Sequence, residues 1–178
     1  MRVIKARRYL PNVMARFCTV QLKVRRIHAY LESMGWDEWD SAIGLRADEP
    51  RRAAKMLSGK SNESTKENPI LPLFHEGVTK ETIFDFWTAQ DFDLQLPNNN
   101  GVTDWGNCDL CFLKGYSKRL SIIRERPQLA DWWMEQEQMV GGRFRKDTPD
   151  YRQMQVIATD NQLFDFGDDE TIPCFCGD

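Results

Sequence analysis

The chain has 178 residues, which is enough for one domain of ordinary size whose core needs no disulfides. Its net charge at pH 7 is −3, and no apolar run reaches the length of a signal peptide or a membrane span. These features argue against a secreted or membrane-spanning protein. We therefore expect a cytoplasmic protein, in which disulfides are uncommon and cysteines serve metal binding or redox chemistry.

Charge is distributed unevenly along the chain. The first 31 residues contain eight Lys or Arg side chains and no acid, whereas no Lys or Arg follows Arg152 and Asp and Glu accumulate there. A basic head and an acidic tail either pair with each other, or the head contacts phosphates, nucleic acid or an acidic partner. The alternative is that both ends are simply solvated.

Hydrophobic spacing and capping residues predict a chain with more helix than strand. The predicted helices are residues 19–33 with Thr19 as N-cap, 51–57, 79–87 with Thr79 as N-cap, 117–126 and 127–140, and the predicted strands are 39–45 and 152–157. Polar composition predicts an exposed loop at residues 58–69. The fold class expected from this pattern is α/β, helix-rich, with a small sheet.

Three apolar groups are candidates for the core. The first helix carries Val20, Val24, Ile27 and Leu31 on one face, and the third would bury Ile83, Phe86 and Trp87. The pair Trp132 and Trp133 is most simply part of the core, and the alternative is an exposed surface for a macromolecule.

The helix at 117–126 carries Lys118, Arg119, Arg124 and Arg126, which would suit salt-dependent nucleic-acid binding. Net acidity and the lack of a recognised motif make nucleic acid the weakest candidate partner.

The five cysteines are the strongest sign of chemistry. Cys108 and Cys111 form a C-x-x-C pair, whose spacing lets two thiolates face one metal ion or cluster. A full ligand set needs two more soft donors, and the two histidines do not have zinc-finger spacing. Cys18, Cys108, Cys111 and a tail cysteine, Cys174, would form an all-thiolate site, which leaves Cys176 free. The alternative is that Cys18 and Cys111 are small buried hydrophobic side chains.

An arginine and acid cluster follows the first predicted strand. Arg46 comes directly after that strand, and Arg51 and Arg52 lie in the first turns of the next helix. Because ligands bind at the carboxyl ends of strands in open α/β sheets, these guanidinium groups could bind a phosphate or sulfate in bidentate fashion. The alternative is that they pair with Asp48 and Glu49 in solvent.

Four segments in this order resemble the sulfonucleotide (phosphoadenosine phosphosulfate, PAPS) reductase family, in particular its phage and prophage branch: "FCTVQLKVRRIHAYL", "WDSAIGLRADEPRR", "ENPILPL…TIFDFW" and "GNCDLCFLKG". The resemblance covers roughly residues 8–155. It implies part of an adenine nucleotide α-hydrolase-like fold, with residues 1–158 as a PAPS-reductase-like C-terminal domain and residues 159–178 as an acidic, Cys-containing tail.

The resemblance also implies ligands. Its cysteine motifs imply a [4Fe–4S] cluster, with zinc as the alternative, held by Cys18, Cys108, Cys111 and a tail cysteine. Its arginine motif implies that Arg46, with Arg51 and Arg52, binds the sulfate or phosphate of an adenine sulfonucleotide, and Lys23 in the "LKV" segment is a further candidate. Cys176 would be the catalytic nucleophile, because a tail thiolate near the basic head would have a lowered pKa.

Two departures from the family pattern shape the functional expectation. The family's Gly-rich "SGG" phosphate loop is absent, and "CFCGD" replaces its usual C-terminal catalytic motif. Loss of the phosphate cradle argues against independent catalysis, since that loop positions the nucleotide. We therefore expect a PAPS-reductase-like, oxidoreductase-type protein that binds a phosphosulfate or phosphate ligand and a metal. The alternative is a non-catalytic phage-type protein that inhibits or regulates a macromolecular partner, for example a host-defence complex.

Overall fold

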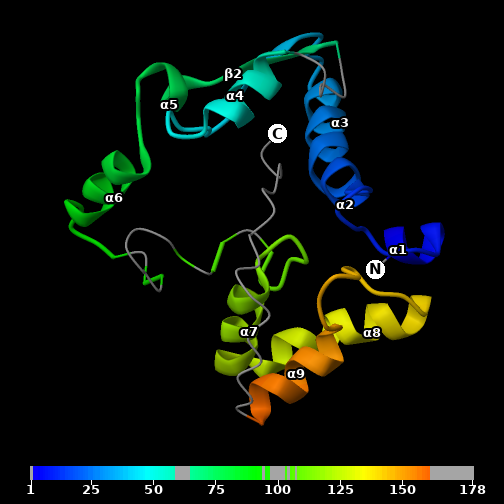
Figure 1. Cartoon of the computed structure of the whole chain (residues 1–178). Helices are drawn as coiled ribbons and strands as arrows, with labels where there is room; N and C mark the ends of the chain where they lie inside the picture. The colour runs from blue at the N-terminus through cyan, green and yellow to red at the C-terminus, as the bar shows by residue number, and fades with distance from the viewer. Residues whose placement is uncertain are drawn as a thin grey trace. The chain divides into compact units, whose positions relative to one another are not determined.

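The structure is a computed structural model that describes residues 2–58, 65–93, 95–96, 103, 105–106 and 108–160. These residues form two compact units. Unit 1 contains the residues up to Gln21 and those from Thr103 onward, and unit 2 begins at Leu22 and includes the described residues up to Leu96. No helix among the described residues is long and apolar enough to cross a membrane. Figure 1 labels the elements.

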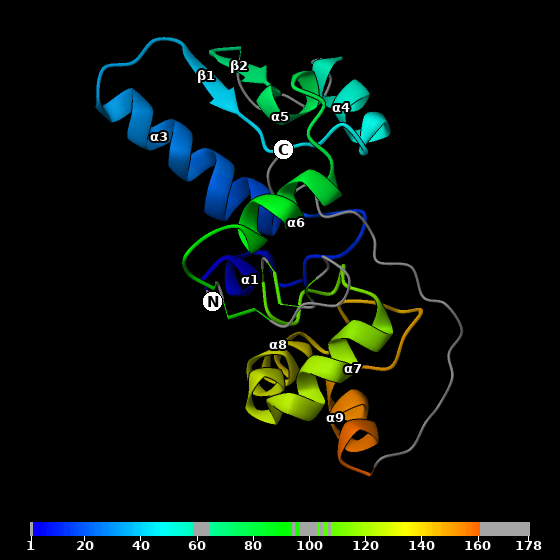
Figure 2. The same ribbon diagram turned by 90° about the vertical axis from the view of Figure 1, so that its left-hand side faces the viewer.

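Unit 1 is a group of short helices. They are α1 (Arg2–Arg7), α2 (Phe17–Thr19), α7 (Tyr116–Glu125), the 3-10 helix η2 (Pro127–Ala130), α8 (Asp131–Val140) and α9 (Tyr151–Thr159). Helices α7, α8 and α9 lie together in both views of the chain (Figures 1 and 2). Gly141 ends α8 with φ 67°, a left-handed conformation that glycine adopts without the penalty of a Cβ.

The core of unit 1 joins the head of the chain to its middle. The head contributes Ile4, Leu10 and Phe17, which are buried with side chains from α7, α9 and the segment before α7. These apolar side chains of the basic head are thus buried in this core, and the charged side chains of the head face outward. Trp132 and Trp133 are partly buried against this core, as the simpler expectation held, and they do not form an exposed surface.

Unit 2 contains a β–α–β unit. Strand β1 (Trp39–Ala42) pairs in parallel with β2 (Glu67–Ile70), and α4 (Pro50–Leu57) lies between them in sequence. Parallel strands need such a crossover, since a tight hairpin connects only antiparallel neighbours. The small core beside it consists of Ile43, Leu45, Ala53, Met56 and Leu71. The described sheet has two strands, so the mixed, helix-rich α/β class is confirmed.

One helical stretch runs from Phe17 to Ser33 and includes the division between the units. It consists of α2, a π-helical segment η1 (Val20–Val24) and α3 (Arg25–Ser33). Thr19 lies inside this stretch, so its prediction as an N-cap is wrong, and Arg16 precedes the helix. The π-helical turn changes which face of the helix the following residues occupy, so Ile27 is exposed. His28 instead packs against Trp39, and its ring lies 3.0 Å from the carboxylate of Glu67.

Three further expectations are wrong in part. Residues 152–157 belong to helix α9 instead of a strand. Of the expected loop at 58–69, residues 59–64 lie outside the described residues, and residues 67–69 belong to β2. Unit 2 also contains α5 (Pro72–His75) and α6 (Lys80–Thr88). Thr79 caps α6 as expected, but Phe86 and Trp87 are exposed instead of buried.

Candidate functional site

The C-x-x-C segment forms a compact turn in unit 1. The backbone N–H of Cys111 donates to the carbonyl of Cys108 at 3.2 Å, and the N–H of Lys114 donates to the carbonyl of Cys111 at 2.9 Å. Leu110 between the cysteines is fully buried, and its carbonyl accepts a hydrogen bond from the Tyr151 hydroxyl. Burial of Leu110 therefore holds the turn in place and leaves Cys108 exposed and Cys111 buried.

Cys18 approaches the same region from the head of the chain. It lies on α2, one residue after the buried Phe17, and is half-buried against the core that contains Cys111. Burial raises the pKa of the Cys18 thiol, and hydrogen bonds from Thr19 act in the opposite direction by favouring the thiolate. A negative charge on Cys108 raises the pKa of Cys18 further, so the two sulfurs are close enough to interact.

Both of the other cysteines affect the pKa of Cys111. Burial raises its pKa to about 11, the Leu113 N–H lowers it, and thiolates at Cys108 and Cys18 raise it again. Cys18 therefore interacts electrostatically with Cys108 and Cys111, although the two segments lie 90 positions apart in sequence. That Cys18, Cys108 and Cys111 share one metal stays a prediction.

The type of donor fits a soft metal, but the arrangement is not a closed ligand set. Among the residues that the structure describes, no group of three His, Cys, Asp or Glu side chains is close enough to hold a metal ion. Hydrogen bonds at Cys18 and Cys111 favour the thiolate form, and thiolates suit zinc or an iron–sulfur cluster by chemistry. The two tail residues of the prediction, Cys174 and Cys176, lie outside the described residues.

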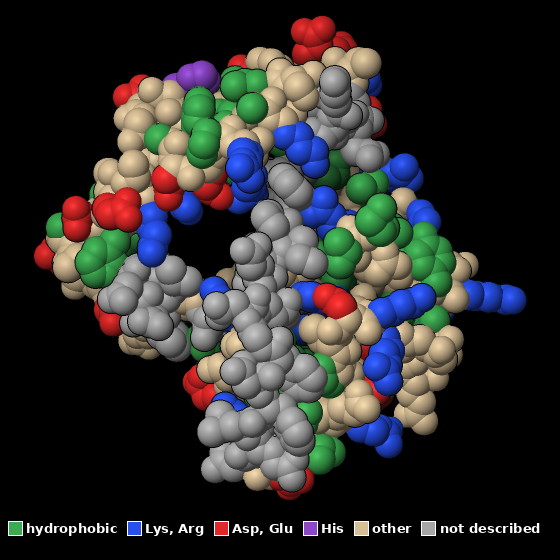
Figure 3. All heavy atoms as spheres, in the orientation of Figure 1, with side chains coloured by type: hydrophobic (Ala, Val, Ile, Leu, Met, Phe, Trp, Pro, Cys, Tyr) green, Lys and Arg blue, Asp and Glu red, His purple; other side chains and the backbone are tan. Residues whose placement is uncertain are grey.

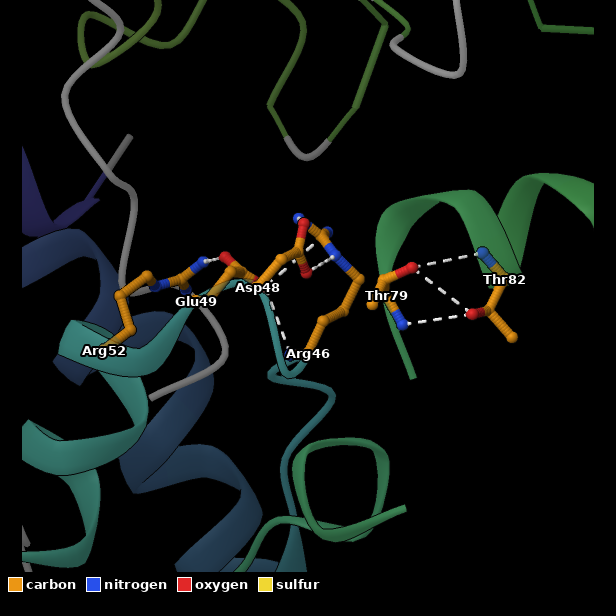
Figure 4. A network of polar contacts seen from close by, with 6 residues as sticks. All are labelled: Arg46, Asp48, Glu49, Arg52, Thr79 and Thr82. Atoms are coloured by element: carbon orange, nitrogen blue, oxygen red, sulfur yellow. Dashed lines mark hydrogen bonds and ion pairs between the residues drawn. The ribbon is translucent and has the colours of Figure 1, made fainter. Parts of the chain in front are cut away.

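The predicted anion-binding loop lies in unit 2, between β1 and α4 (Figure 4). Arg46 donates to both carboxylate oxygens of Asp48, at 2.8 and 3.2 Å, and lies 3.5 Å from Glu49. Arg52 pairs with the other oxygen of Glu49. The arginines thus pair with Asp48 and Glu49, as the alternative to anion binding predicted. The guanidinium group of Arg46 forms a bidentate contact with a carboxylate.

The Asp48 carboxylate occupies the place in this loop that a bound anion would take. The hydrogen bond from Arg46 lowers the pKa of Asp48, and the backbone N–H of Lys80 at the start of α6 lowers it as well. The same bond to Asp48 raises the pKa of Arg46. A negative charge at this point is therefore stabilised by one guanidinium and one helix N-terminus. Arg51 is exposed on α4, and Lys23 is exposed in η1.

Unit 1 also contains a pocket that was not predicted from the sequence. Met134, Glu137 and Gln138 of α8 line it together with Gly141, Gly142, Arg143, Asp150 and Arg152, and its volume is about 430 Å³. Glu137 is buried and accepts hydrogen bonds from the N–H groups of Phe144 and Tyr151 at 3.0 and 2.9 Å. The D-x-x-Q capping box of Asp150 and Gln153 was the available sequence signal, since it marks the start of α9.

Comparison with known proteins gives one informative relative. No protein-family model matches the chain, and no solved structure matches it. The chain is 32% identical over 111 residues to "Uncharacterized nin region protein ORF290" of Escherichia phage lambda. The matched residues are 61% of this chain and 32% of the relative, so the chain spans about a third of the relative's length. A phage protein is therefore among the proteins to which this chain is similar.

Proposed function

We propose that the chain is a sulfonucleotide-reductase-like protein that holds a cysteine-ligated metal centre in unit 1. The observation that supports this most directly is that Cys18 and Cys111 pack in the same core and that the charge of Cys108 raises the pKa of both. The order of motifs along the chain agrees with the resemblance to the family.

The chemistry of the three thiols supports a metal over isolated core cysteines. A buried thiol with a pKa of about 11 is neutral at pH 7, whereas a metal ligand must be the thiolate. The Leu113 N–H and the hydrogen bonds from Thr19 favour the charged form and suit sulfurs that carry negative charge when ligated. A bound metal supplies the positive charge that keeps the thiolates ionised. Cys174 is the proposed fourth ligand; a [4Fe–4S] cluster is the family expectation and zinc the alternative.

Metal analysis tests the centre. Protein purified without oxygen should contain about one cluster or one zinc ion per chain, measured by elemental analysis and by absorbance in the iron–sulfur charge-transfer region. Substitution to Ser at Cys18, Cys108 or Cys111 should each remove most of the metal. Cys176→Ser is the matched control and should retain it. Metal-free wild-type protein, or full metal content in the Cys108→Ser variant, would contradict the proposal.

The second part of the proposal is that the Arg46 loop binds a phosphate or sulfate group. Asp48 already occupies the guanidinium fork, so an external anion has to displace that carboxylate. Neutralising the competitor should therefore strengthen binding. The planar, bidentate geometry of Arg46 matches a phosphate or sulfate oxygen pair as well as it matches a carboxylate.

Calorimetric titration with PAPS and with its product nucleotide tests the loop. Asp48→Asn should tighten binding about tenfold, which corresponds to about 1.4 kcal/mol, and Arg46→Gln should weaken it by at least as much. Lys55→Gln removes an exposed charge from α4 and should leave the affinity unchanged. Weaker binding by Asp48→Asn would contradict competition. Sulfite release from PAPS with a thiol reductant, lost in Cys176→Ser, would establish the family activity, and no release from wild type would exclude it.

A further inference from the structure

Helix α6 and the residues after it expose a group of aromatic side chains. None of the nine residues of α6 is buried. Phe84, Phe86, Trp87 and Phe92 are each between 40 and 57% exposed. The rings of Phe86, Trp87 and Phe92 contact edge to face, with centroids 5.1 Å apart for Phe86 and Trp87 and 6.0 Å apart for Trp87 and Phe92. We call these four residues the α6 aromatic surface.

Acidic side chains surround this surface. Asp85 lies on α6, and Asp91 and Asp93 flank Phe92 in sequence, and all three are exposed. Figure 3 shows green hydrophobic side chains beside red acidic ones over α6, at the left of the view. A nine-residue helix without buried side chains gains little from tertiary packing, and isolated helices of that length are marginal in water. The α6 aromatic surface therefore has the features of an interface whose partner stabilises it.

Helix α3 exposes a second apolar group, with basic neighbours. Ile27, Tyr30 and Met34 are between 53 and 64% exposed. Their spacing of three and four residues places them in one row along the helix. Arg26, four positions before Tyr30, is exposed beside this row, and Lys23 and Arg25 are exposed on the preceding turn. We call Ile27, Tyr30 and Met34 the α3 stripe.

The two surfaces complement each other in polarity and charge. Both belong to unit 2, one with acidic and one with basic neighbours. We propose that the occupant of the α6 aromatic surface is the α3 stripe of a second copy of this chain. Because each copy carries both surfaces, two copies related by a two-fold axis make the contact twice and close the dimer. Two such contacts bury on the order of 1,000 Å² in total, which reaches the lower range for specific interfaces.

Sedimentation equilibrium and light scattering on the full chain test this dimer. Wild-type protein should show a concentration-dependent dimer that weakens as salt rises, since Arg26 and the aspartates contribute to it. Tyr30→Ser and Phe86→Ser should each raise the dimer dissociation constant at least tenfold. Leu57→Ser removes an exposed apolar side chain from α4 in the same unit and should leave it unchanged. Circular dichroism of each variant should match wild type, because both substituted side chains are exposed.

A mixing experiment distinguishes this pairing from other contacts. A Tyr30→Ser chain mixed with a Phe86→Ser chain retains one intact α3–α6 contact, whereas each variant alone retains none. Fluorescence energy transfer between the two labelled variants should therefore exceed that of either variant with itself. Monomeric wild-type protein at high concentration would overturn the proposal and leave the α6 aromatic surface to a different partner. Unimpaired dimers of Tyr30→Ser would overturn it as well, since they would indicate α6-to-α6 contact.

Discussion

Charged side chains in unit 1 tie the segment between α8 and α9 to its surroundings. Arg145 is buried and bonds the carboxylate of Asp147. Glu137 accepts from the N–H of Phe144, within that segment, and from the N–H of Tyr151 at the start of α9. Arg119 of α7 is buried as well and donates to Thr148 at 3.0 Å. A buried charge without such bonds would cost several kcal/mol, so these residues order the segment.

The pair of Arg145 and Asp147 predicts a pH-dependent stability. The hydrogen bond from Arg145 lowers the pKa of Asp147 below its ordinary value of 3.8. The unfolded chain therefore binds the proton more readily, and the stabilisation is complete above that value and lost as pH falls through the folded pKa. Asp147→Asn should lower the free energy of unfolding by about 1 kcal/mol at pH 7, a modest value because the carboxylate is 64% exposed.

Urea denaturation between pH 2 and pH 7 checks this prediction. The difference between wild type and Asp147→Asn should shrink toward zero at the acid end, where the wild-type carboxyl is protonated. Glu135→Gln, an exposed change on α8, is the matched control and should stay within about 0.5 kcal/mol of wild type. A difference that stays constant over this pH range would show that Asp147 acts through its shape and not its charge.

Residue type predicted the environment of some side chains and not of others. Cys18 and Cys111 were considered as metal ligands or as buried hydrophobic side chains, and the structure places both against the core of unit 1, with Cys111 buried. Arg119 was expected on an exposed basic helix face, and it is buried. Its partners, Thr148 and the ring of Tyr151, lie about thirty positions later, so no local pattern marks them.

At the scale of the element, capping signals were more reliable than apolar composition. Thr79 begins α6 with a capping box, as predicted, and Pro50 begins α4 one residue before the predicted helix at 51–57. Residues 152–157 contain Val156 and Ile157, which favour a strand by composition. They form a helix because Asp150 caps α9 and the core takes one face of that helix, through Tyr151, Met154 and Ala158.

Two other elements show how tertiary context overrides local pattern. The π-helical turn at Val20–Val24 changes which side chains of α3 face the sheet, and periodicity of 3.6 residues does not anticipate it. Strand β2 contains Pro69 and follows a polar segment, so composition predicted a loop. Pairing with β1 makes it a strand, and a two-stranded sheet has only edge strands, where proline is tolerated.

At the scale of the whole molecule, one domain was predicted for residues 1–158. The described residues form two compact units. The three described cysteines of the candidate metal centre belong to unit 1, and the Arg46 loop belongs to unit 2. A ligand that binds only the folded form of one unit stabilises that unit by mass action. The two ligands of the proposed function should therefore stabilise different parts of the chain.

Hydrogen exchange with mass spectrometry measures this separation. Metal loading should slow exchange in α2, in residues 108–116 and in α9, and leave β1, α4 and β2 unchanged. The matched control is Cys108→Ser, which should show no slowing anywhere when metal is added. Equal slowing in both units of the wild-type protein would show that they unfold together and would contradict the separation.

The sequence by itself determined the helix-rich α/β class and several helix boundaries, because capping chemistry is local. Only the tertiary structure decided which apolar faces are covered, that Asp48 occupies the fork of Arg46, and that the head of the chain packs into the core of unit 1. The physical reason is that burial and ion pairing depend on residues distant in sequence. An amphipathic pattern records that a face is apolar, but the partner that covers it is specified elsewhere.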